Sequence, residues 1–401
     1  MSDKKSITSK ELQGVSQLVE DTTAGITDLV EAMFQRILYP PFIPKTPVQH
    51  LISGISTLTF KSIKLITKSV GSGLGFSFSQ LDTQLAQVPA KEKEAILSAL
   101  NGIVGDYLVS KQNTLAITMQ FKYQHQSIQL NKAGIQAAYP TANSRILIMI
   151  HGLCMNDRQW ERNEHNHGKK LAEELNFSPI YLHYNTGQHI STNGQQFSQL
   201  LEQLMHNWPV PVEEINIVAH SMGGLVGRSA IYYGQQEDKI WLKHLKKVVF
   251  LGTPHHGAPL EQAGNYLDII LEAAPYSKPF ARLGKIRSAG ITDLRHGNLL
   301  DTDWDNNSSE ALSDHRTSVP LPQQIDFYSI AATITKEGEP LANALIGDGL
   351  VPIKSALGNH DDANKTLQFS KTATHIVYEH NHMDVLDSQQ VYSTIKRWLS
   401  C

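Results

Sequence analysis

The chain has 401 residues, 41% of them hydrophobic, and a formal net charge of −3. This length and composition favour one large packed domain with an appendage over a disordered chain, and the charge gives no reason to expect nucleic acid as a partner. The two cysteines, Cys154 and Cys401, are too few for a disulfide framework and fit a reducing compartment.

The first 112 residues are expected to form a helical N-terminal region. Apolar residues recur at helical spacing from Ile26 to Leu38, and the two prolines after Tyr39 end that pattern. A second apolar stretch, Leu51–Val70, carries lysines, and a third helix is expected from about Ala90 to Val109. This region either packs on the rest of the chain and covers its own apolar stripes, or presents a basic amphipathic surface to a membrane.

The N-terminal sequence is polar and lacks the apolar core of a signal peptide. Lysines interrupt Leu51–Val70, which is the best candidate for a membrane span. We therefore expect a cytoplasmic protein, with peripheral membrane contact through the N-terminal helices as the alternative. Export by a route without a leader stays open.

Residues 113–401 alternate between short apolar runs and helical patterns. A hairpin or edge strand is expected within Ala116–Leu130. Mainly apolar strands are expected further on, at Arg145–Ile150, Pro179–Tyr184, Ile215–Ala219, Lys246–Leu251, Gln324–Ala332 and Thr374–Tyr378. Helices are expected at Trp160–Leu175, Asn193–His206 and Ser388–Leu399. This order predicts an α/β fold with a mostly parallel central sheet and helices on both faces.

Residues 258–322 interrupt the alternation of strands and helices. They contain an apolar piece, Tyr266–Ala274, and a polar stretch that extends through Asn306–Ser309. Ligands of such sheets bind outside the carboxyl ends of the strands, and long insertions at this edge are usually functional. We expect a lid-like insertion that forms an acyl-binding wall.

The segment Ile215–Ala230 carries the strongest chemical signal. An apolar strand is followed at once by a helix, and the turn between them is Ala219-His220-Ser221-Met222-Gly223. Small residues two before and two after Ser221 let strand and helix approach closely, and the sharp turn exposes the serine on a strained backbone. The turn also lies at a helix N-terminus, where free N–H groups stabilise negative charge. Ser221 is therefore the candidate nucleophile.

A serine nucleophile needs a histidine base, and the base needs a carboxylate that orients it. The candidate acid is Asp348, which has a glycine on either side, and Asp361 and Asp362 are its rivals in a later loop. The candidate base is His382, which follows the last predicted strand, and His380 is the second choice.

The tetrahedral intermediate of acyl transfer needs two N–H donors. One is expected from Met222, directly after the nucleophile, and the other from Leu153, where Gly152 permits an unusual backbone. The neighbouring Cys154 is interpreted as a small buried thiol.

The eighteen histidines raise the question of a metal site. His165 and His167 are two residues apart, which would put them on different faces of a helix, and His255 and His256 are adjacent and cannot easily share one ion. No spacing resembles a structural zinc site, so we expect neither a metal nor another cofactor.

Five short motifs resemble the lipase and esterase branch of the α/β-hydrolase superfamily. They are Ile-His-Gly-Leu, Ala-His-Ser-Met-Gly-Gly-Leu, Leu-Gly-Thr-Pro-His-His-Gly-Ala-Pro, Gly-Asp-Gly-Leu-Val-Pro and Asn-His-Met. From about Ser144 onward, the chain is similar to bacterial serine lipases and to the group that resembles inositol deacylases of lipid anchors. The resemblance implies the α/β-hydrolase fold and assigns nucleophile, acid and base to Ser221, Asp348 and His382, in the chain order that this fold uses.

These observations favour a carboxylic-ester hydrolase that acts on a small-molecule or lipid-like ester through an acyl-enzyme on Ser221. An acyltransferase would use the same residues and differ only in what attacks the acyl-enzyme. A non-catalytic, membrane-associated binding protein that retained the fold is the third hypothesis. In all three, residues 113–401 form the α/β domain and residues 1–112 the helical N-terminal region.

Overall fold

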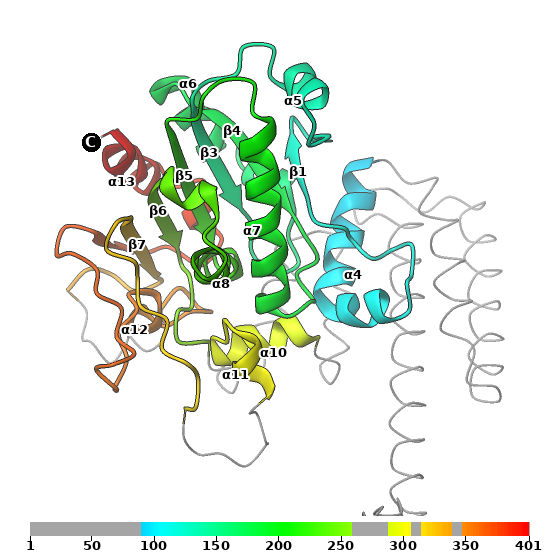
Figure 1. The fold of residues 1–401 in the computed structure, drawn as a ribbon. Coiled ribbons are helices and arrows are strands. Elements are labelled where there is room, and N and C mark those ends of the chain that lie inside the picture. Colours follow the sequence, from blue (N-terminus) through cyan, green and yellow to red (C-terminus); the bar gives the residue numbers. More distant parts are fainter. Residues whose placement is uncertain (1–89, 259–287, 306–313, 339–346, 401) are drawn as a thin grey trace, which may run out of the picture.

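The computed structural model describes residues 90–258, 288–305, 314–338 and 347–400 (Figure 1). They are organised around an eight-stranded sheet with the strand order β2-β1-β4-β3-β5-β6-β7-β8. Strand β1 pairs antiparallel with β2 and β4, and all the other neighbours are parallel. The prediction of a mostly parallel α/β sheet with a hairpin at its edge is confirmed.

The strands and helices occupy the following ranges. The strands are β1 Gln120–Tyr123, β2 Gln126–Ser127, β3 Arg145–Ile150, β4 Ser178–His183, β5 Glu214–His220, β6 Leu245–Leu251, β7 Asp326–Thr333 and β8 Thr374–Tyr378. The α-helices are α4 Ala90–Ser110, α5 Lys132–Ala138, α6 His167–Leu175, α7 Ile190–Asn207, α8 Met222–Gln236, α10 Ala289–His296, α11 Asp301–Asp305, α12 Ile353–Ala356 and α13 Gln389–Ser400. Short 3-10 turns are η1 Asp157–Trp160, η2 Ile240–Lys243 and η5 Asp384–Leu386.

The sheet has an apolar layer on each face. Along β3, Ile148 belongs to a core shared with α4, α7 and α8, whereas its neighbour Met149 belongs to a second core shared with α6 and α13. Successive strand residues point to opposite faces, so a strand buried on both sides must be apolar throughout. This explains the unbroken apolar run in β3 and confirms that helices cover both faces.

Helix α4 packs directly on the sheet domain. The predicted helix Ala90–Val109 corresponds to α4, which is kinked at Val104, where φ −133° and ψ 21° are not helical. Its residues Leu100 and Ile103 are fully buried in the same core as the central strands. For this helix, the structure therefore shows an apolar stripe covered by the rest of the chain. Residues 1–89 lie outside the described residues, so the boundary near residue 112 and the membrane-facing alternative for the earlier helices stay predictions.

One other prediction is corrected by the structure, and the predicted insertion is described only in part. The helix expected at Trp160–Leu175 is interrupted, because residues 161–166 form a turn in which Asn163 and Glu164 have positive φ, and α6 begins only at His167. Asn166 accepts a hydrogen bond from Lys169 N–H and fixes this later helix start. Within the predicted insertion, α10 and α11 are described, whereas the apolar piece Tyr266–Ala274 lies outside the described residues, and the lid stays a prediction.

Among the helices that the structure describes, none combines the length and apolarity that a transmembrane helix requires.

Candidate active site

The turn at Ser221 has the strained geometry that the sequence predicts. Strand β5 ends at His220, α8 begins at Met222, and Ser221 between them has φ 54° and ψ −125°, a conformation that favours glycine. Its N–H donates to the carbonyl oxygen of Leu251 at the end of β6, at 2.9 Å. A Cβ atom at Gly223 would lie 2.7 Å from two carbonyl oxygens of the β3 end, so only glycine fits there.

Asp348 and His382 form a buried pair beside this turn. His382 Nδ1 donates to Asp348 Oδ2 at 2.6 Å, and both side chains are at most 2% exposed. The other carboxylate oxygen, Oδ1, accepts from the backbone N–H groups of Leu350 and Val351 at 2.9 and 2.8 Å. The backbone N–H of His382 also donates to the carbonyl oxygen of Asp348, at 3.1 Å. The loop after β7 therefore fixes the carboxylate, and the carboxylate fixes the imidazole.

Two backbone contacts bring this pair to the end of β5. His220 Nε2 donates to the carbonyl oxygen of His382 at 3.1 Å, and the two imidazole rings lie 4.7 Å apart. Gly252, just after β6, lies so close that a Cβ atom there would be 3.2 Å from Asp348 Oδ2 and 3.3 Å from the His382 ring. Ser221, His382 and Asp348 therefore lie at one edge of the sheet, at the carboxyl ends of β5, β6, β7 and β8.

Two atoms of this group have no hydrogen-bond partner among the described residues. They are Ser221 Oγ and His382 Nε2, and both are buried. Buried polar atoms are normally paired, so unpaired ones at the carboxyl ends of the strands call for an explanation. No hydrogen bond joins the two atoms to each other, and a hydroxyl and a ring nitrogen are the kinds of group between which a triad transfers its proton.

The rival residues are engaged elsewhere. His380 hydrogen-bonds through Nδ1 to the Tyr378 carbonyl oxygen at 2.5 Å and through Nε2 to Ser388 Oγ at 2.8 Å. Asp361 is 93% exposed and forms an ion pair with Lys354, and Asp362 caps a local turn. Of the candidate acids and bases, the structure joins only Asp348 and His382 to each other.

Of the two predicted oxyanion donors, Met222 directly follows Ser221 and Leu153 follows a glycine that packs against Ser221. Gly152 precedes Leu153 and packs against the nucleophile, since a Cβ atom at Gly152 would be 3.0 Å from Ser221 Cβ. Met222 is the first residue of α8, so its N–H has no acceptor within the helix. Leu153 and Met222 are both buried. This arrangement is suited to binding a negatively charged oxygen near Ser221.

The loop that carries Leu153 is supported by α4, which sequence reasoning did not connect with the site. Cys154 has φ 60°, and its Sγ packs so closely against Gly102 of α4 that a Cβ atom there would lie 2.2 Å away. Asn156 Nδ2 donates to Ser98 Oγ of α4 at 3.1 Å. Burial raises the pKa of the Cys154 thiol to about 12, which agrees with a structural thiol.

His220 is a second residue that sequence reasoning missed, although it stands next to the nucleophile. Burial, followed by the neighbouring His382, keeps the pKa of His220 well below its ordinary value, so the ring stays neutral and acts as a hydrogen-bond donor. The signal that could have found it is its place at the last position of a strand, where side chains reach the ligand edge.

The paired histidines do not form a metal site in the described residues. The expectation that His165 and His167 face different sides is wrong, because His165 precedes α6 and its Nε2 lies 2.6 Å from His167 Nδ1. His167 is in turn bonded to the carbonyl oxygen of Val385 at 2.9 Å. Within the part of the chain that is described, no group of three or more His, Cys, Asp or Glu side chains is placed to hold a metal ion.

Comparison with known proteins adds a family match and distant structural similarities. Residues 141–336 match the family model described as the PGAP1-like alpha/beta domain, a range that includes Ser221 and ends before Asp348 and His382. No curated protein matches the sequence of this chain.

The solved structures that resemble the chain are distant. Mature Bacillus licheniformis lipase BlEst2 is 14% identical, with 64% of this chain and 92% of that chain covered and a TM-score of 0.41. EstA from Clostridium botulinum is 14% identical, with coverage of 65% and 88% and a TM-score of 0.36. Phospholipase PlaB from Legionella pneumophila is 16% identical, with coverage of 53% and 45% and a TM-score of 0.36. These likenesses are too weak to bear on the substrate. Residues 141–336 therefore match the PGAP1-like alpha/beta domain, and the observed sheet has the mostly parallel arrangement of an α/β fold.

Proposed function

We propose that this protein is a serine ester hydrolase of the lipase and esterase type. The observation that carries the proposal is the buried contact between His382 Nδ1 and Asp348 Oδ2 at 2.6 Å, with His382 Nε2 and Ser221 Oγ both left without a described partner. A carboxylate on Nδ1 selects the tautomer in which Nε2 can accept a proton. The proposal therefore gives each of the three residues a definite role.

The reaction follows from these roles. Ser221 Oγ attacks the ester carbonyl carbon while its proton moves to His382 Nε2, and the resulting imidazolium is stabilised by Asp348. The N–H groups of Leu153 and Met222 bind the oxygen that becomes negative. Collapse of the tetrahedral intermediate breaks the ester C–O bond, and the proton on Nε2 goes to the leaving alcohol. Water then attacks the acyl-enzyme by the same route, which releases the carboxylic acid and restores Ser221.

The substrate class is proposed to be lipid-like or other acyl esters. The support is the resemblance of the motifs to lipases and the apolar sequence within 258–322. Peripheral contact with a membrane through the N-terminal helices remains part of the proposal. A series of p-nitrophenyl esters of increasing acyl-chain length tests the substrate class, because a lipase prefers long chains and an esterase short, soluble ones.

Labelling with a fluorophosphonate probe tests the nucleophile directly. We expect stoichiometric labelling of the native chain, which the Ser221→Ala and His382→Ala variants lose. Ser400→Ala, which changes an exposed serine on α13, is the matched control and should keep full labelling. Labelling that survives in Ser221→Ala would overturn the proposal, and no labelling of the native chain would favour a non-catalytic binding protein.

Product analysis separates hydrolysis from acyl transfer. The same acyl-enzyme gives a free acid when water attacks it and a new ester when an alcohol attacks it. We expect the free acid as the main product even with an alcohol acceptor present. A new ester as the dominant product would assign the chain to the acyltransferases.

A further inference from the structure

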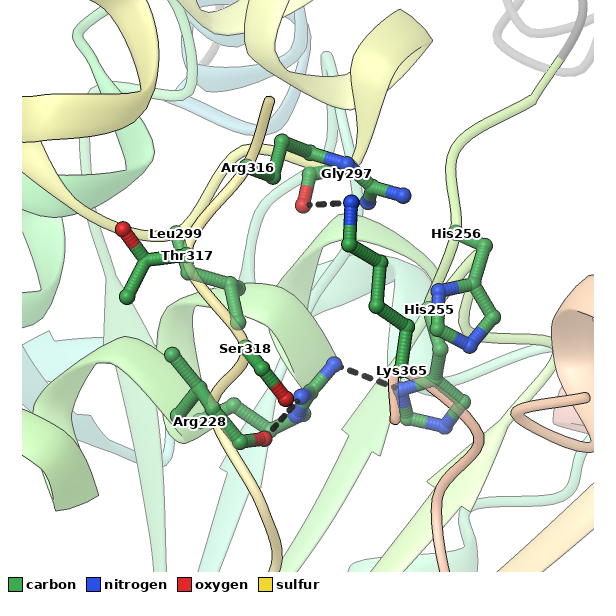
Figure 2. A pocket seen from close by; sticks show the side chains of 10 residues that line it. Arg228, His255, His256, Gly297, Leu299, Arg316, Thr317, Ser318 and Lys365 are labelled. Carbon is green, nitrogen blue, oxygen red and sulfur yellow. Dashed lines mark hydrogen bonds between the residues drawn. The ribbon is translucent and has the colours of Figure 1, made fainter. Parts of the chain in front are cut away.

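A small, basic pocket lies beside the loop that follows β6, and His255 and His256 of that loop line it. Figure 2 shows it between Arg228 of α8, the two histidines His255 and His256, and the side chains of Arg316 and Lys365. Arg228 is seven residues after Ser221, about two helical turns or 10 Å along α8, so the pocket is separate from the candidate active site. Its cavity volume of about 20 Å³ is large enough for one small group.

Arg228 is a buried cation without a carboxylate partner among the described residues. Arg228 as a whole residue is only 5% exposed. The guanidinium donates to the carbonyl oxygen of Val319 at 2.7 Å and reaches His255 Nδ1 only at 3.5 Å, while its Nε has no described partner. Burying a charge without a counter-ion costs folding free energy, and the unused Nε–H donor of Arg228 could bind an anion.

The mouth of the pocket holds more positive than negative charge. Arg316 and Lys365 are each 14% exposed and share one carboxylate, Asp314, at 2.7 and 3.0 Å. Asp303 is the other acidic group nearby, and its oxygens accept backbone N–H groups of Leu299, Leu300 and Thr317. Three cations therefore face two carboxylates, both of which are already engaged.

Burial in the first place, and the neighbouring positive charges after it, lower the pKa values of the groups around the pocket. Burial lowers the pKa of the Arg228 guanidinium to about 9, with Arg316 lowering it further and Asp303 opposing the shift. Burial also lowers the pKa of His256 to about 4, and the charges of Arg316 and Arg228 act in the same direction. His255 is likewise held neutral by burial and by Arg228, and its Nε2 has no described partner. An anion in the pocket would oppose these shifts, because a nearby negative charge stabilises the charged form of each cationic group.

We propose that this pocket binds a small oxyanion, either inorganic phosphate or the phosphate group of a phosphoester. The cationic side chains come from three separate segments and approach from different directions (Figure 2). A tetrahedral phosphate has an oxygen for each of them, whereas a planar carboxylate has two, and arginine forks pair well with phosphate oxygens. The proposal does not depend on the ester-hydrolase proposal, because none of its residues belongs to the triad.

Calorimetric titration of the full chain with inorganic phosphate tests the site. The Ser221→Ala variant serves as the background, so that turnover plays no part, and chloride keeps the ionic strength constant. We expect saturable binding of one phosphate per chain and about tenfold weaker binding in Lys365→Met or Arg316→Met, as expected for the loss of one charge-assisted contact. Lys396→Met is the matched control, since Lys396 pairs with Glu174 on the α6–α13 surface, and should bind phosphate as the parent does.

A second experiment distinguishes a phosphoester headgroup from free phosphate as the ligand. A short-chain, soluble phosphatidate is compared with the matching neutral diacylglycerol as a competitor of bound phosphate. Displacement by phosphatidate alone assigns the site to a phosphoester headgroup, and failure of both lipids to compete assigns it to free phosphate. The proposal is overturned if the parent shows no saturable phosphate binding, or if Lys365→Met and Lys396→Met weaken binding equally. These readouts need no esterase activity, so failure of the hydrolase proposal would leave them unchanged.

Discussion

Two buried charged regions of this protein differ in how completely their polar atoms are paired. In the Lys122 cluster, which consists of Glu94, Lys122, His125, Asp157 and Arg158, Lys122 Nζ contacts Glu94 at 2.8 Å and Asp157 at 3.1 Å. Asp157 also pairs with His125 at 2.7 Å, and Glu94 with Arg158 at 2.5 Å. In the candidate active site, His382 Nδ1 is hydrogen-bonded to Asp348, whereas Ser221 Oγ and His382 Nε2 have no hydrogen-bond partner among the described residues.

The two regions differ in which of their groups are available for chemistry. The charges of the Lys122 cluster pair with one another and link α4, β1 and η1; its one buried oxygen without a hydrogen bond among the described residues, Asp157 Oδ1, still lies 3.1 Å from Lys122 Nζ. A group with an open donor or acceptor at the ligand edge of the sheet can exchange a proton. Variants of the two regions should therefore separate stability from activity.

The largest effect is expected from Asp348→Asn. The amide can still accept the backbone N–H groups of Leu350 and Val351, but it no longer holds His382 in the reactive tautomer. The turnover number for a p-nitrophenyl ester should fall about 10⁴-fold, with little change in the free energy of unfolding. Asp361→Asn, which changes the exposed rival carboxylate, is the control and should keep full activity. Equal activity of the two variants would rule out Asp348 as the acid.

Lys122→Met, in contrast, is expected to lower the free energy of unfolding. Removal of this amine leaves Asp157 and Glu94 without their shared cation, and breaking a buried pair costs about 3–5 kcal/mol of unfolding free energy. Urea denaturation measures the loss. Lys239→Met removes a lysine that pairs with Glu237 on the surface and should change stability by about 1 kcal/mol or less. A similar effect of both variants would mean that the Lys122 cluster is not a structural centre.

Gly105→Ala probes the contact between α4 and the loop after β4. A Cβ atom at Gly105 would lie 1.9 Å from Asn185 Oδ1, and Asn185 is held by its own bonds to Gly105 O and Gly187 N. We expect a loss of about 1–3 kcal/mol of stability, because neither partner can move freely. Gly227→Ala is the matched control in α8, where the nearest atom would be 3.7 Å away, and it should be neutral or stabilising. Thermal unfolding of both variants measures this difference in stability.

A pH dependence is expected from the histidines between the two regions. Burial lowers the pKa of His151 to about 4 and that of His183 to about 3, and the charge of Lys122 acts in the same direction on both. Below about pH 6.5 the unfolded chain therefore binds protons that the folded chain does not, and the free energy of unfolding falls as the pH drops towards 4. Each such histidine contributes about 1.4 kcal/mol per pH unit in this range.

The variant His183→Gln isolates one of these contributions. The slope of unfolding free energy against pH, measured by urea denaturation between about pH 6.5 and 4, should become shallower by about 1.4 kcal/mol per pH unit. His206→Gln, which replaces an exposed histidine near the end of α7, should leave the slope unchanged. An unchanged slope in His183→Gln would show that His183 is not held neutral in the folded protein.

The sheet and the candidate residues for the chemistry were predictable from the sequence. Short apolar runs such as the one in Arg145–Ile150 favour strands buried on both faces, and their alternation with helices favours parallel pairing. The turn at Ser221 was readable because its constraints are local, with small residues needed within two positions of the serine. The order of acid and base then limited the choice to Asp348 and His382 and their rivals, since this fold places them after the late strands.

Which of the rival carboxylates contacts His382, and which elements pack on the candidate site, followed only from the folded structure. That Asp348 rather than Asp361 faces His382, that α4 packs on the loop carrying Leu153, and that Arg228 meets Arg316 and Lys365 all depend on contacts between distant segments. The contact between His165 and His167 was not predicted, because both residues were assigned to one helix, whereas α6 begins only at His167. Periodicity and turn residues report local conformation, whereas burial and pairing of charges are properties of segments that meet only after folding.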